Sequence, residues 1–250
     1  MRPEGNLKIM SIKAPDLEWL QGDVPRAEGF NDTYFSKAGG LAETRHVFLQ
    51  GNGLPGRFDG CERFTIAEFG FGTGLNFLTT LTAWQERTNR PDLTFLTFEL
   101  FPMSGEQLAR SLAAFPELAP LAEELLQAWS PEPGWNSLKI AGANLQIGIG
   151  DARELIGELN AGMAGEGEGG EPAIAPIDAW FLDGFSPARN PELWDADLLK
   201  VAADLTAHGG TLATYTAAGW VRRNLQAAGF EIEKAEGFAG KREMVKGRKP

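Results

Sequence analysis

A glycine-rich turn between a strand and a helix limits the fold of this chain more than any other segment. Residues 63–76 read Arg-Phe-Thr-Ile-Ala-Glu-Phe-Gly-Phe-Gly-Thr-Gly-Leu-Asn. The apolar run at 64–69 predicts a buried strand, and the pattern that begins at Leu75 predicts a helix. Glycine permits positive φ angles and lets the backbone approach a ligand that a Cβ atom would block. This order of strand, glycine turn and helix is typical of a nucleotide-binding unit.

Two interpretations of this turn stay open from the segment alone. It is either a tight strand-to-helix connection without a ligand, or a nucleotide-like molecule contacts Gly70, Gly72 and Gly74. The spacing Gly-x-Gly-x-Gly differs from the Gly-x-Gly-x-x-Gly of dinucleotide folds. Glu68, just before the glycines, favours a ligand with an amine or other positive charge over a pyrophosphate. S-adenosylmethionine carries an amine and a sulfonium, so we expect it as the cofactor.

The composition excludes several classes of protein. The 250 residues include 23 Lys and Arg against 34 Asp and Glu, and the net charge of −11 argues against a general nucleic-acid coat and against DNA as a partner. Cys61 is the sole cysteine, so no intrachain disulfide is expected and the cytoplasm is the default location. No apolar stretch reaches the ~20 residues of a membrane span. With one cysteine and two histidines, we expect no metal site.

Strand and helix patterns alternate along most of the chain. Seven strands are predicted, at 64–69, 93–99, 144–149, 177–182, 211–215, 230–235 and 242–245. Helices are predicted at 74–87, 104–129 (broken near Pro116 and Pro120), 151–159, 191–207 and 217–228. Such alternation gives a parallel sheet with helices on both faces, and the short link before the last strand makes the last two strands an antiparallel hairpin. This α/β plan is that of a class I S-adenosylmethionine-dependent methyltransferase, a Rossmann-like sheet of seven strands with an antiparallel last strand.

Two regions fall outside this plan. Residues 1–62 contain strand-like pieces at 8–12 and 45–49, and we expect them to form a small N-terminal cap on a methyltransferase domain at 63–250. Residues 157–176 are rich in glycine and glutamate and hold too few apolar side chains to pack, so we expect a mobile surface loop.

Four acidic residues come at the ends of successive predicted strands: Glu68, Glu99, Asp151 and Asp183. The carboxyl ends of parallel strands meet at one edge of a sheet, so we expect these residues to share a cleft. A carboxylate at the position of Glu99, after the second strand, accepts hydrogen bonds from ribose hydroxyls. Asp151 opens a helix, and either an N-cap or a contact with an adenine amino group explains it; the two are compatible.

Asp183 is the candidate catalytic residue. The apolar strand at 177–182 delivers it into a turn that contains Phe185 and Pro187. The acceptor of a transferred methyl group is expected here, with Phe185 and Pro187 as a flat wall for a base. Trp194 lies at helical spacing and is better explained as part of the core.

Several longer strings match one known family, at 32–36, 40–52, 68–78, 98–102, 178–191, 209–216, 218–223, 228–230 and 237–244. The most specific are Asp-Gly-Phe-Ser-Pro at 183–187 and Lys-Arg-Glu-Met at 241–244. On these strings the chain resembles the methyltransferase part of the bacterial bifunctional tRNA 5-methylaminomethyl-2-thiouridine biosynthesis proteins, in a stand-alone form that lacks the FAD-dependent oxidoreductase domain.

The resemblance implies a substrate and a reaction. One methyl group would move from S-adenosylmethionine to the 5-aminomethyl group of the modified wobble uridine in tRNA. The cofactor would contact the glycine turn with Leu75 and Asn76, and also Asp151 with Ala152. Asp183 would orient the amine and take its proton. The sequence shows no second nucleotide-binding unit, so no FAD is expected, and a separate oxidoreductase that acts on the same uridine is a candidate partner.

The anticodon loop of tRNA requires cations for its phosphates. A local basic rim is expected from five residues near the later strands: Arg189, Arg222, Arg223, Lys241 and Arg242. Three alternatives stay open. They are a methyltransferase that acts on a small-molecule or protein amine, a nucleotide-dependent oxidoreductase, and a non-catalytic RNA-binding protein that keeps the fold. The glycine spacing and the terminal hairpin argue against the second, and the presence of Asp183 argues against the third.

Overall fold

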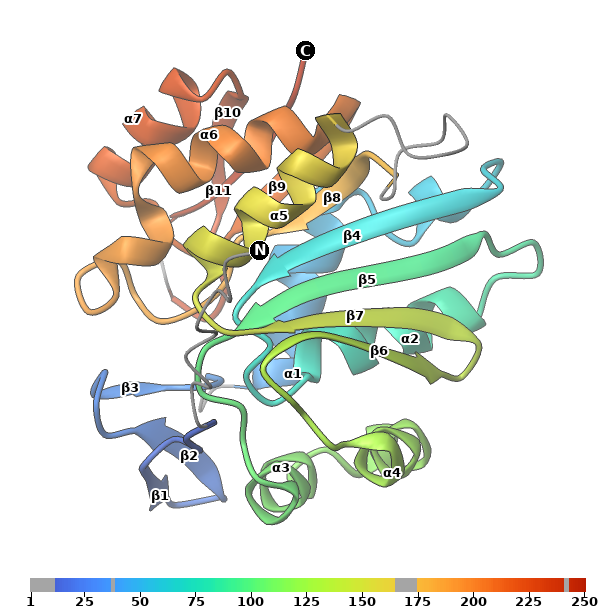
Figure 1. The fold of residues 1–250 in the computed structure, drawn as a ribbon, viewed down its shortest axis with the longest axis vertical. Helices are drawn as coiled ribbons and strands as arrows, with labels where there is room; N and C mark the ends of the chain where they lie inside the picture. Colours follow the sequence, from blue (N-terminus) through green and yellow to red (C-terminus); the bar gives the residue numbers. More distant parts are fainter. Residues whose placement is uncertain (1–11, 37–38, 165–174, 241–242) are drawn as a thin grey trace, which may run out of the picture.

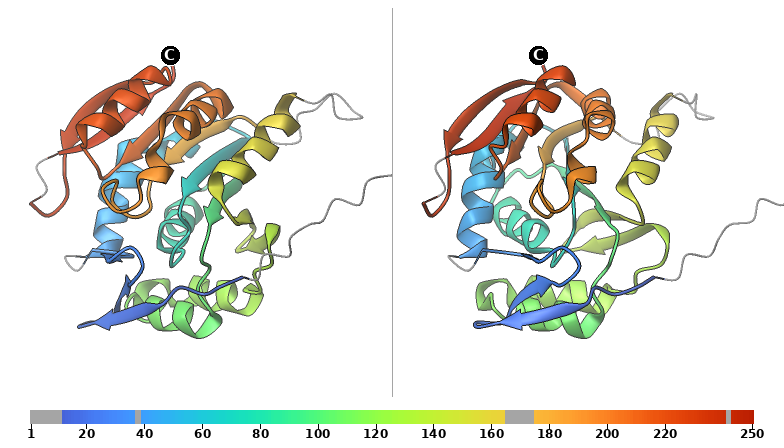
Figure 2. Two further views of the ribbon diagram at one scale, coloured as in Figure 1. Left: turned by 60° about the vertical axis from the view of Figure 1, so that its left-hand side comes forward. Right: turned by 90° about the vertical axis from the view of Figure 1, so that its left-hand side faces the viewer.

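A central sheet with helices on both faces forms the body of the protein (Figures 1 and 2). This architecture comes from a computed structural model, which describes residues 12–36, 39–164, 175–240 and 243–250. A separate three-stranded antiparallel sheet lies at the lower left of Figure 1. Its strands are β1 (Leu17–Leu20), β2 (Val24–Ala27) and β3 (Asp32–Thr33).

The central sheet is mixed. Its strands are β4 (Arg63–Phe69), β5 (Asp92–Glu99), β6 (Gly134–Ile140), β7 (Ala143–Ile149), β8 (Ile177–Phe181), β9 (Thr206–Thr214), β10 (Glu231–Glu236) and β11 (Glu243–Arg248). They run in the order β10-β11-β9-β8-β4-β5-β7-β6. The strands from β9 to β7 are parallel neighbours. Because β11 is antiparallel to both β9 and β10, the predicted terminal hairpin is confirmed.

Strand β6 is an eighth strand that the sequence pattern missed. It pairs antiparallel with β7 over seven residues and forms an edge of the sheet. Most of its side chains are partly or fully exposed, so it lacks the buried apolar run by which the inner strands were found. All seven predicted strands therefore exist, and β6 is an additional strand that pairs with β7, the third of the predicted strands.

Each face of the sheet is covered by its own helices. The helices are α1 (Gly40–Thr44), α2 (Leu75–Gln85), α3 (Gly105–Leu112), α4 (Ala119–Ala128), α5 (Ala152–Ala164), α6 (Ala196–Leu205) and α7 (Gly219–Ala227). Short 3-10 helices lie at Gln50–Asn52, Gly56–Phe58, Pro116–Leu118 and Pro191–Trp194. Apolar side chains of α5, α6 and α7 share one core cluster, and those of α1 and α2 share the other, on the opposite face (Figure 2).

Alternation along the inner strands explains why both faces are apolar. In β4, Ile66 joins the cluster under α2, whereas its neighbour Ala67 joins the cluster under α5. In β5, Phe95 likewise joins the cluster under α2 and its neighbour Leu96 joins the cluster under α5. Burying one such large side chain contributes about 1.5–3 kcal/mol, so the paired faces hold the strand ends, and the residues that follow them, in a fixed arrangement.

One local prediction was wrong, and a second is not tested. The run at 45–49 was expected to be a strand, but Arg45–Leu49 is a π-helix that continues α1, with Val47, Phe48 and Leu49 buried. A short buried apolar run suits a strand or a helix equally well. The expected strand at 8–12 falls outside the described residues except for Ile12, which is not in a strand. Side chains before residue 62, among them Phe35 and Val47, join the same core as α2.

The expected loop at 157–176 is helical in its first part. Helix α5 continues to Ala164, because Leu155, Ile156 and Leu159 bury their side chains against the sheet and extend the apolar stripe. Residues 165–174 lie outside the part of the chain that the structure describes.

Candidate active site

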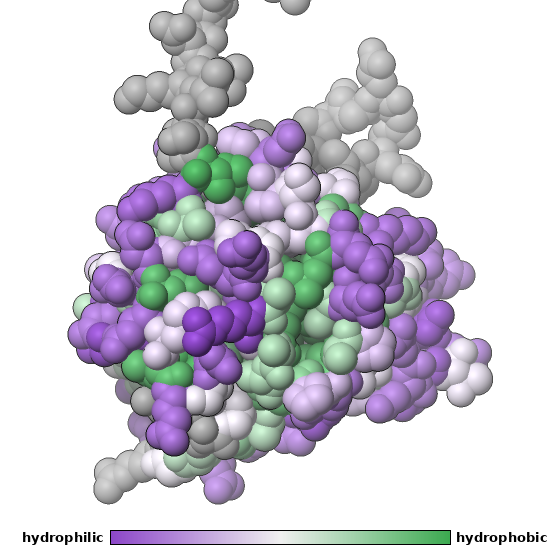
Figure 3. All heavy atoms as spheres, turned by 90° about the horizontal axis from the view of Figure 1, so that it is seen from below, coloured by the Kyte–Doolittle hydropathy of each residue, from purple (hydrophilic) through white to green (hydrophobic). Residues whose placement is uncertain are grey.

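A cavity of about 540 Å³ opens at the carboxyl edge of the parallel strands. This volume suits a ligand of drug or nucleoside size. The strand ends are held together there, since the N–H groups of Gly70 and Phe71 both donate to the carbonyl of Phe98, at 3.1 and 3.0 Å. Seen from below Figure 1, apolar side chains line a hollow in the molecular surface and hydrophilic side chains surround it (Figure 3).

The glycine turn forms one wall of this cavity. Gly70 and Gly72 have φ angles of 81° and 55° and both line it. A Cβ atom at Gly72 would lie 3.1 Å from a ring carbon of Tyr34, so both this tight contact and the positive φ angle favour glycine there whether or not a ligand is bound. Gly74, at φ 70°, is the N-cap of α2 and packs on the Phe71 ring instead of facing the cavity. Leu75, the next residue, lines the cavity.

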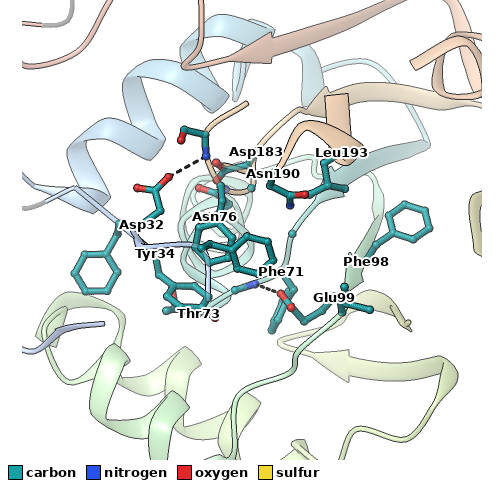
Figure 4. Close-up of a pocket in the computed structure, with 18 of the residues that line it drawn as sticks. Asp32, Tyr34, Phe71, Thr73, Asn76, Phe98, Glu99, Asp183, Asn190 and Leu193 are labelled. Carbon is teal, nitrogen blue, oxygen red and sulfur yellow. Dashed lines mark hydrogen bonds between the residues drawn. The ribbon is translucent and has the colours of Figure 1, made fainter. Parts of the chain in front are cut away.

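Glu99 projects from the end of β5 with both oxygens engaged by backbone groups. One accepts a hydrogen bond from the N–H of Gly72 (Figure 4) and the other from the N–H of Phe101, each at 2.8 Å. Burial raises the pKa of Glu99, and these backbone hydrogen bonds oppose that shift. Each carboxylate oxygen has a second lone pair, so the group can still accept hydrogen bonds from a pair of hydroxyls.

The cavity wall next to Glu99 contains apolar side chains and an ion pair between Asp151 and Arg153. Leu100 is 41% exposed and borders the cavity, as does Ala152. Asp151 caps α5 by accepting the N–H of Arg153 at 2.9 Å, so the predicted N-cap is confirmed. The Arg153 guanidinium also holds the pKa of Asp151 below its usual range and contacts Glu192 at 3.2 Å. Of the basic residues that the structure describes, Arg153 alone lines the cavity.

The opposite end of the cavity gathers negative charge around Tyr215. Burial raises the pKa of Tyr215, and the charges of Asp183, Asp32 and Glu43 raise it further. The Tyr215 hydroxyl donates to the carbonyl of Gly184 at 2.9 Å. Figure 4 shows Asp32 and Asp183 close together at this end, away from Glu99. We refer to the side chains of Asp32, Glu43, Asp183 and Tyr215 as the acidic end of the cavity.

Aromatic rings cover the acidic end. Phe30 stacks on Phe185 with ring centroids 4.5 Å apart, and Tyr34 meets Phe185 edge-on at 5.1 Å. Asp32 ties the same two segments together by accepting the N–H of Ser186 at 2.9 Å. A flat apolar group can therefore contact rings from the residues on either side of β3 and from the turn after β8.

Three predicted contacts, Glu68, Gly74 and Pro187, do not border the cavity. Glu68 is fully buried and does not border the cavity, because Asn76 and Thr97 bind its carboxylate, at 2.8 and 2.9 Å. A direct contact between Glu68 and a bound amine is therefore not supported. Pro187 is also buried outside the cavity wall. The core assignment of Trp194 is correct: it is 1% exposed, and its indole N–H donates to the carbonyl of Phe185 at 3.1 Å.

The predicted basic residues do not line the cavity. Arg189 is exposed, and its guanidinium donates to the carbonyl of Phe30 at 3.3 Å, which places it beside the aromatic cover. Arg222 and Arg223 lie in α7 and are absent from the cavity wall. Lys241 and Arg242 fall outside the described residues. The remaining predicted contacts, Gly70, Gly72, Leu75, Asn76, Glu99, Asp151, Ala152, Asp183 and Phe185, all border the cavity.

Residues from the N-terminal segment complete the site and were not predicted as site residues. Phe30, Asp32 and Tyr34 come about 150 positions before the turn they contact, and no local pattern links them to it. The matching string at 32–36 was the one signal that pointed to this segment.

Among residues 12–36, 39–164, 175–240 and 243–250, no group of three or more His, Cys, Asp or Glu side chains is placed to hold a metal ion. None of the described helices has the length and apolar character needed to cross a bilayer.

Strand order, glycine turn and acidic strand ends together define a class I methyltransferase. Residues 116–250 match the family described as S-adenosyl-L-methionine-dependent methyltransferase. The chain belongs to this family, and S-adenosylmethionine is its cofactor.

Curated relatives narrow the comparison. The chain is 42% identical over 248 residues to the tRNA 5-methylaminomethyl-2-thiouridine biosynthesis bifunctional protein MnmC of Aeromonas salmonicida. It is 45% identical over 243 residues to the protein of the same name from Aromatoleum aromaticum. In both cases 96% of this chain is covered but only 36% of the relative, so the chain spans about a third of their length. The crystal structure of MNMC2 from Aquifex aeolicus matches 95% of this chain and 71% of its own, with a TM-score of 0.70 and 22% identity, which supports the fold.

Proposed function

We propose that this methyltransferase acts on tRNA and methylates the 5-aminomethyl group of the modified wobble uridine, giving 5-methylaminomethyl-2-thiouridine. The observation that carries the proposal is the acidic end of the cavity with its aromatic cover. Three carboxylates there favour a positively charged alkylamine, and Phe30 and Phe185 offer stacking surface for a base. The shared name of the relatives at 42–45% identity supports the same substrate.

The cavity suits S-adenosylmethionine better than a dinucleotide. Its wall carries several carboxylates, and its described cation, Arg153, is already paired with Asp151 and Glu192. This arrangement favours a ligand with an amine and a sulfonium and disfavours a pyrophosphate. Glu99 would accept the ribose hydroxyls, and Leu100 with Ala152 would contact the adenine. Gly70, Gly72 and Leu75 would lie along the rest of the cofactor.

The protein's part in the chemistry is to hold and deprotonate the amine. S-adenosylmethionine supplies a methyl group on a positively charged sulfur, which is released as a neutral thioether. The attacking nitrogen needs a free lone pair, whereas an alkylamine is mostly protonated at neutral pH. Asp183 would hydrogen-bond the amine, aim it along the line of attack and take its proton. Alignment alone lowers such a barrier by several kcal/mol, roughly 7–11 at best.

The N-terminal residues belong to this proposal as a cap. We propose that residues 1–62 complete the acceptor end for the domain at 63–250, since Phe30, Asp32, Tyr34 and Glu43 all border the cavity. Arg189, which lies beside the aromatic cover, would meet a phosphate of the anticodon loop. Arg222, Arg223, Lys241 and Arg242 would extend the same basic surface.

The proposal includes the cellular setting. Because the substrate is tRNA, the protein would work in the cytoplasm, without a metal ion and without FAD. A separate oxidoreductase that acts on the same uridine is the partner we propose, since the relatives are named as bifunctional proteins.

The test uses labelled S-adenosylmethionine and tRNA from cells that lack this activity, followed by digestion and mass analysis of nucleosides. The expected product is the wobble nucleoside with one added methyl group. Two reactions are the controls: the wild-type protein with an unmodified transcript of the same tRNA, and the Asp183→Asn protein with the modified tRNA. In both, the tRNA should stay unlabelled. Transfer to a small amine or a protein with none to the tRNA would overturn the proposal.

A further inference from the structure

Asn76 lies at the centre of a buried chain of hydrogen bonds that the proposed reaction has not used so far. It is the second residue of α2 and is 8% exposed. Its amide nitrogen donates to a carboxylate oxygen of Asp183 at 2.7 Å and to one of Glu68 at 2.8 Å. A primary amide has two N–H groups, so one serves each carboxylate.

The orientation of this amide is fixed from its other side. The hydroxyl of Thr44, the last residue of α1, donates to the amide oxygen of Asn76 at 2.7 Å. Turning the amide over would place its NH2 group against that hydroxyl and its oxygen against two carboxylates. Both N–H groups are used by protein atoms, and the oxygen is bound as well. Asn76 therefore has little capacity left for the cofactor contact expected from the sequence.

Glu68 gives the chain a rigid end. It is fully buried in β4, and the hydroxyl of Thr97 in β5 donates to its second oxygen at 2.9 Å. These two strands are paired, with Glu68 opposite Thr97 in the register. Three hydrogen bonds thus link the middle of the sheet to the acidic end of the cavity, and they run from Thr97 through Glu68 and Asn76 to Asp183.

We propose that Asn76 is a positioning residue that holds Asp183 toward the acceptor amine, with Glu68 as its fixed anchor. The identity of the acceptor rests on the function proposed above. Asp183 follows β8 in a turn with Gly184, whose φ angle is 104°, so the turn alone does not restrict the side chain as a helix would. The bond from Asn76 crosses from α2 to this turn and supplies the restriction.

Asn76→Leu is the test, because leucine has a similar shape and no donor. We expect kcat to fall roughly 100-fold, the loss that a displacement of about 1 Å produces. The dissociation constant of S-adenosylhomocysteine should change by less than about threefold, under half the 1.4 kcal/mol of a tenfold change. The KM for tRNA should stay within the same limit. A fall in cofactor affinity that accounts for the whole loss, or an unchanged kcat, would overturn the proposal.

Thr97→Val is the matched control. It removes a hydrogen bond from the same buried chain but leaves the bond between Asn76 and Asp183 in place. We expect a lower midpoint of thermal unfolding, with kcat lowered far less than in Asn76→Leu. If Thr97→Val lowers kcat as far as Asn76→Leu does, the chain serves stability alone and the proposal fails. Should the Leu variant not fold, Asn76→Ser takes its place with the same expected loss, because a serine hydroxyl is too short to reach Asp183.

A structural measurement separates this proposal from the proposed function. Crystals of the wild type and of Asn76→Leu, both grown with S-adenosylhomocysteine, report the side-chain torsion of Asp183 whatever the acceptor is. A displaced or divided Asp183 side chain in the variant supports the proposal, and an unchanged one overturns it. Failure of the wild type to methylate tRNA would overturn the proposed function alone.

Discussion

Replacing Glu99 by glutamine should weaken both cofactor binding and the fold. The carboxylate satisfies two backbone donors, on Gly72 and Phe101, at 2.8 Å each. A glutamine amide has one oxygen, so one of these N–H groups would face an NH2 group. An unsatisfied buried donor costs about 1–3 kcal/mol of folding stability. The same change removes a charged acceptor for the ribose hydroxyls, and hydrogen bonds to charged groups contribute about 1.5–3 kcal/mol.

The loss of hydrogen bonds between the Glu99 carboxylate and the ribose sets the expected change in cofactor affinity. At about 1.4 kcal/mol for each factor of ten, the dissociation constant of S-adenosylmethionine should rise roughly 10- to 150-fold. Isothermal titration calorimetry measures it directly, without an acceptor. Glu106→Gln, an exposed acid in the first turn of α3, is the control and should bind as the wild type does. An affinity for Glu99→Gln within threefold of the wild type would refute the placement of the ribose at this carboxylate.

Three further outcomes test other parts of the site. Burial, followed by the charge of Asp183, raises the pKa of Glu68 well above its ordinary value of 4.5, so the native protein holds this proton more tightly than the unfolded chain does. The contribution of Glu68 to wild-type stability therefore falls as pH rises from about 4.5 toward the raised pKa. The thermal midpoint of Glu68→Gln should rise relative to that of the wild type over the same pH range, and a difference between the two midpoints that does not vary with pH would contradict this. Phe30→Ala should raise the KM for tRNA about 5- to 150-fold, since stacking contributes about 1–3 kcal/mol per base, and an unchanged KM in steady-state assays would remove Phe30 from the acceptor site. Asp32→Asn keeps an acceptor for the Ser186 N–H but lowers the negative charge, so the KM for the amine acceptor should rise about fivefold, or 1 kcal/mol; equal or tighter binding would argue against charge recognition.

The positions of the inner strands along the chain followed from the sequence because burial leaves a plain signal. The runs at 64–69 and 93–99 are apolar on both faces, as strands covered by two helical layers must be. Strand β6 escaped because an edge strand needs no such run. The segment Arg45–Leu49 was assigned wrongly because a short buried run does not distinguish a strand from a helix.

Site residues were predictable where chemistry follows a strand end. Glu99, Asp151 and Asp183 were found in this way, and all three border the cavity. Glu68 satisfies the same rule but points into the protein, because the side chains of successive residues in a strand alternate and Asn76 lies ready to bind it. Phe30 reaches the site through tertiary packing on Phe185, which no local pattern encodes.

The identity of the methylated atom tests the account most directly. Wild-type protein, labelled S-adenosylmethionine and tRNA bearing 5-aminomethyl-2-thiouridine should give label on the wobble nucleoside, located by fragmentation to the side-chain nitrogen. The Asp183→Asn protein should bind the cofactor with normal affinity but transfer almost none of the labelled methyl group to the tRNA. Label on another nucleoside or on a ring atom, or full activity without the carboxylate at position 183, would contradict the account.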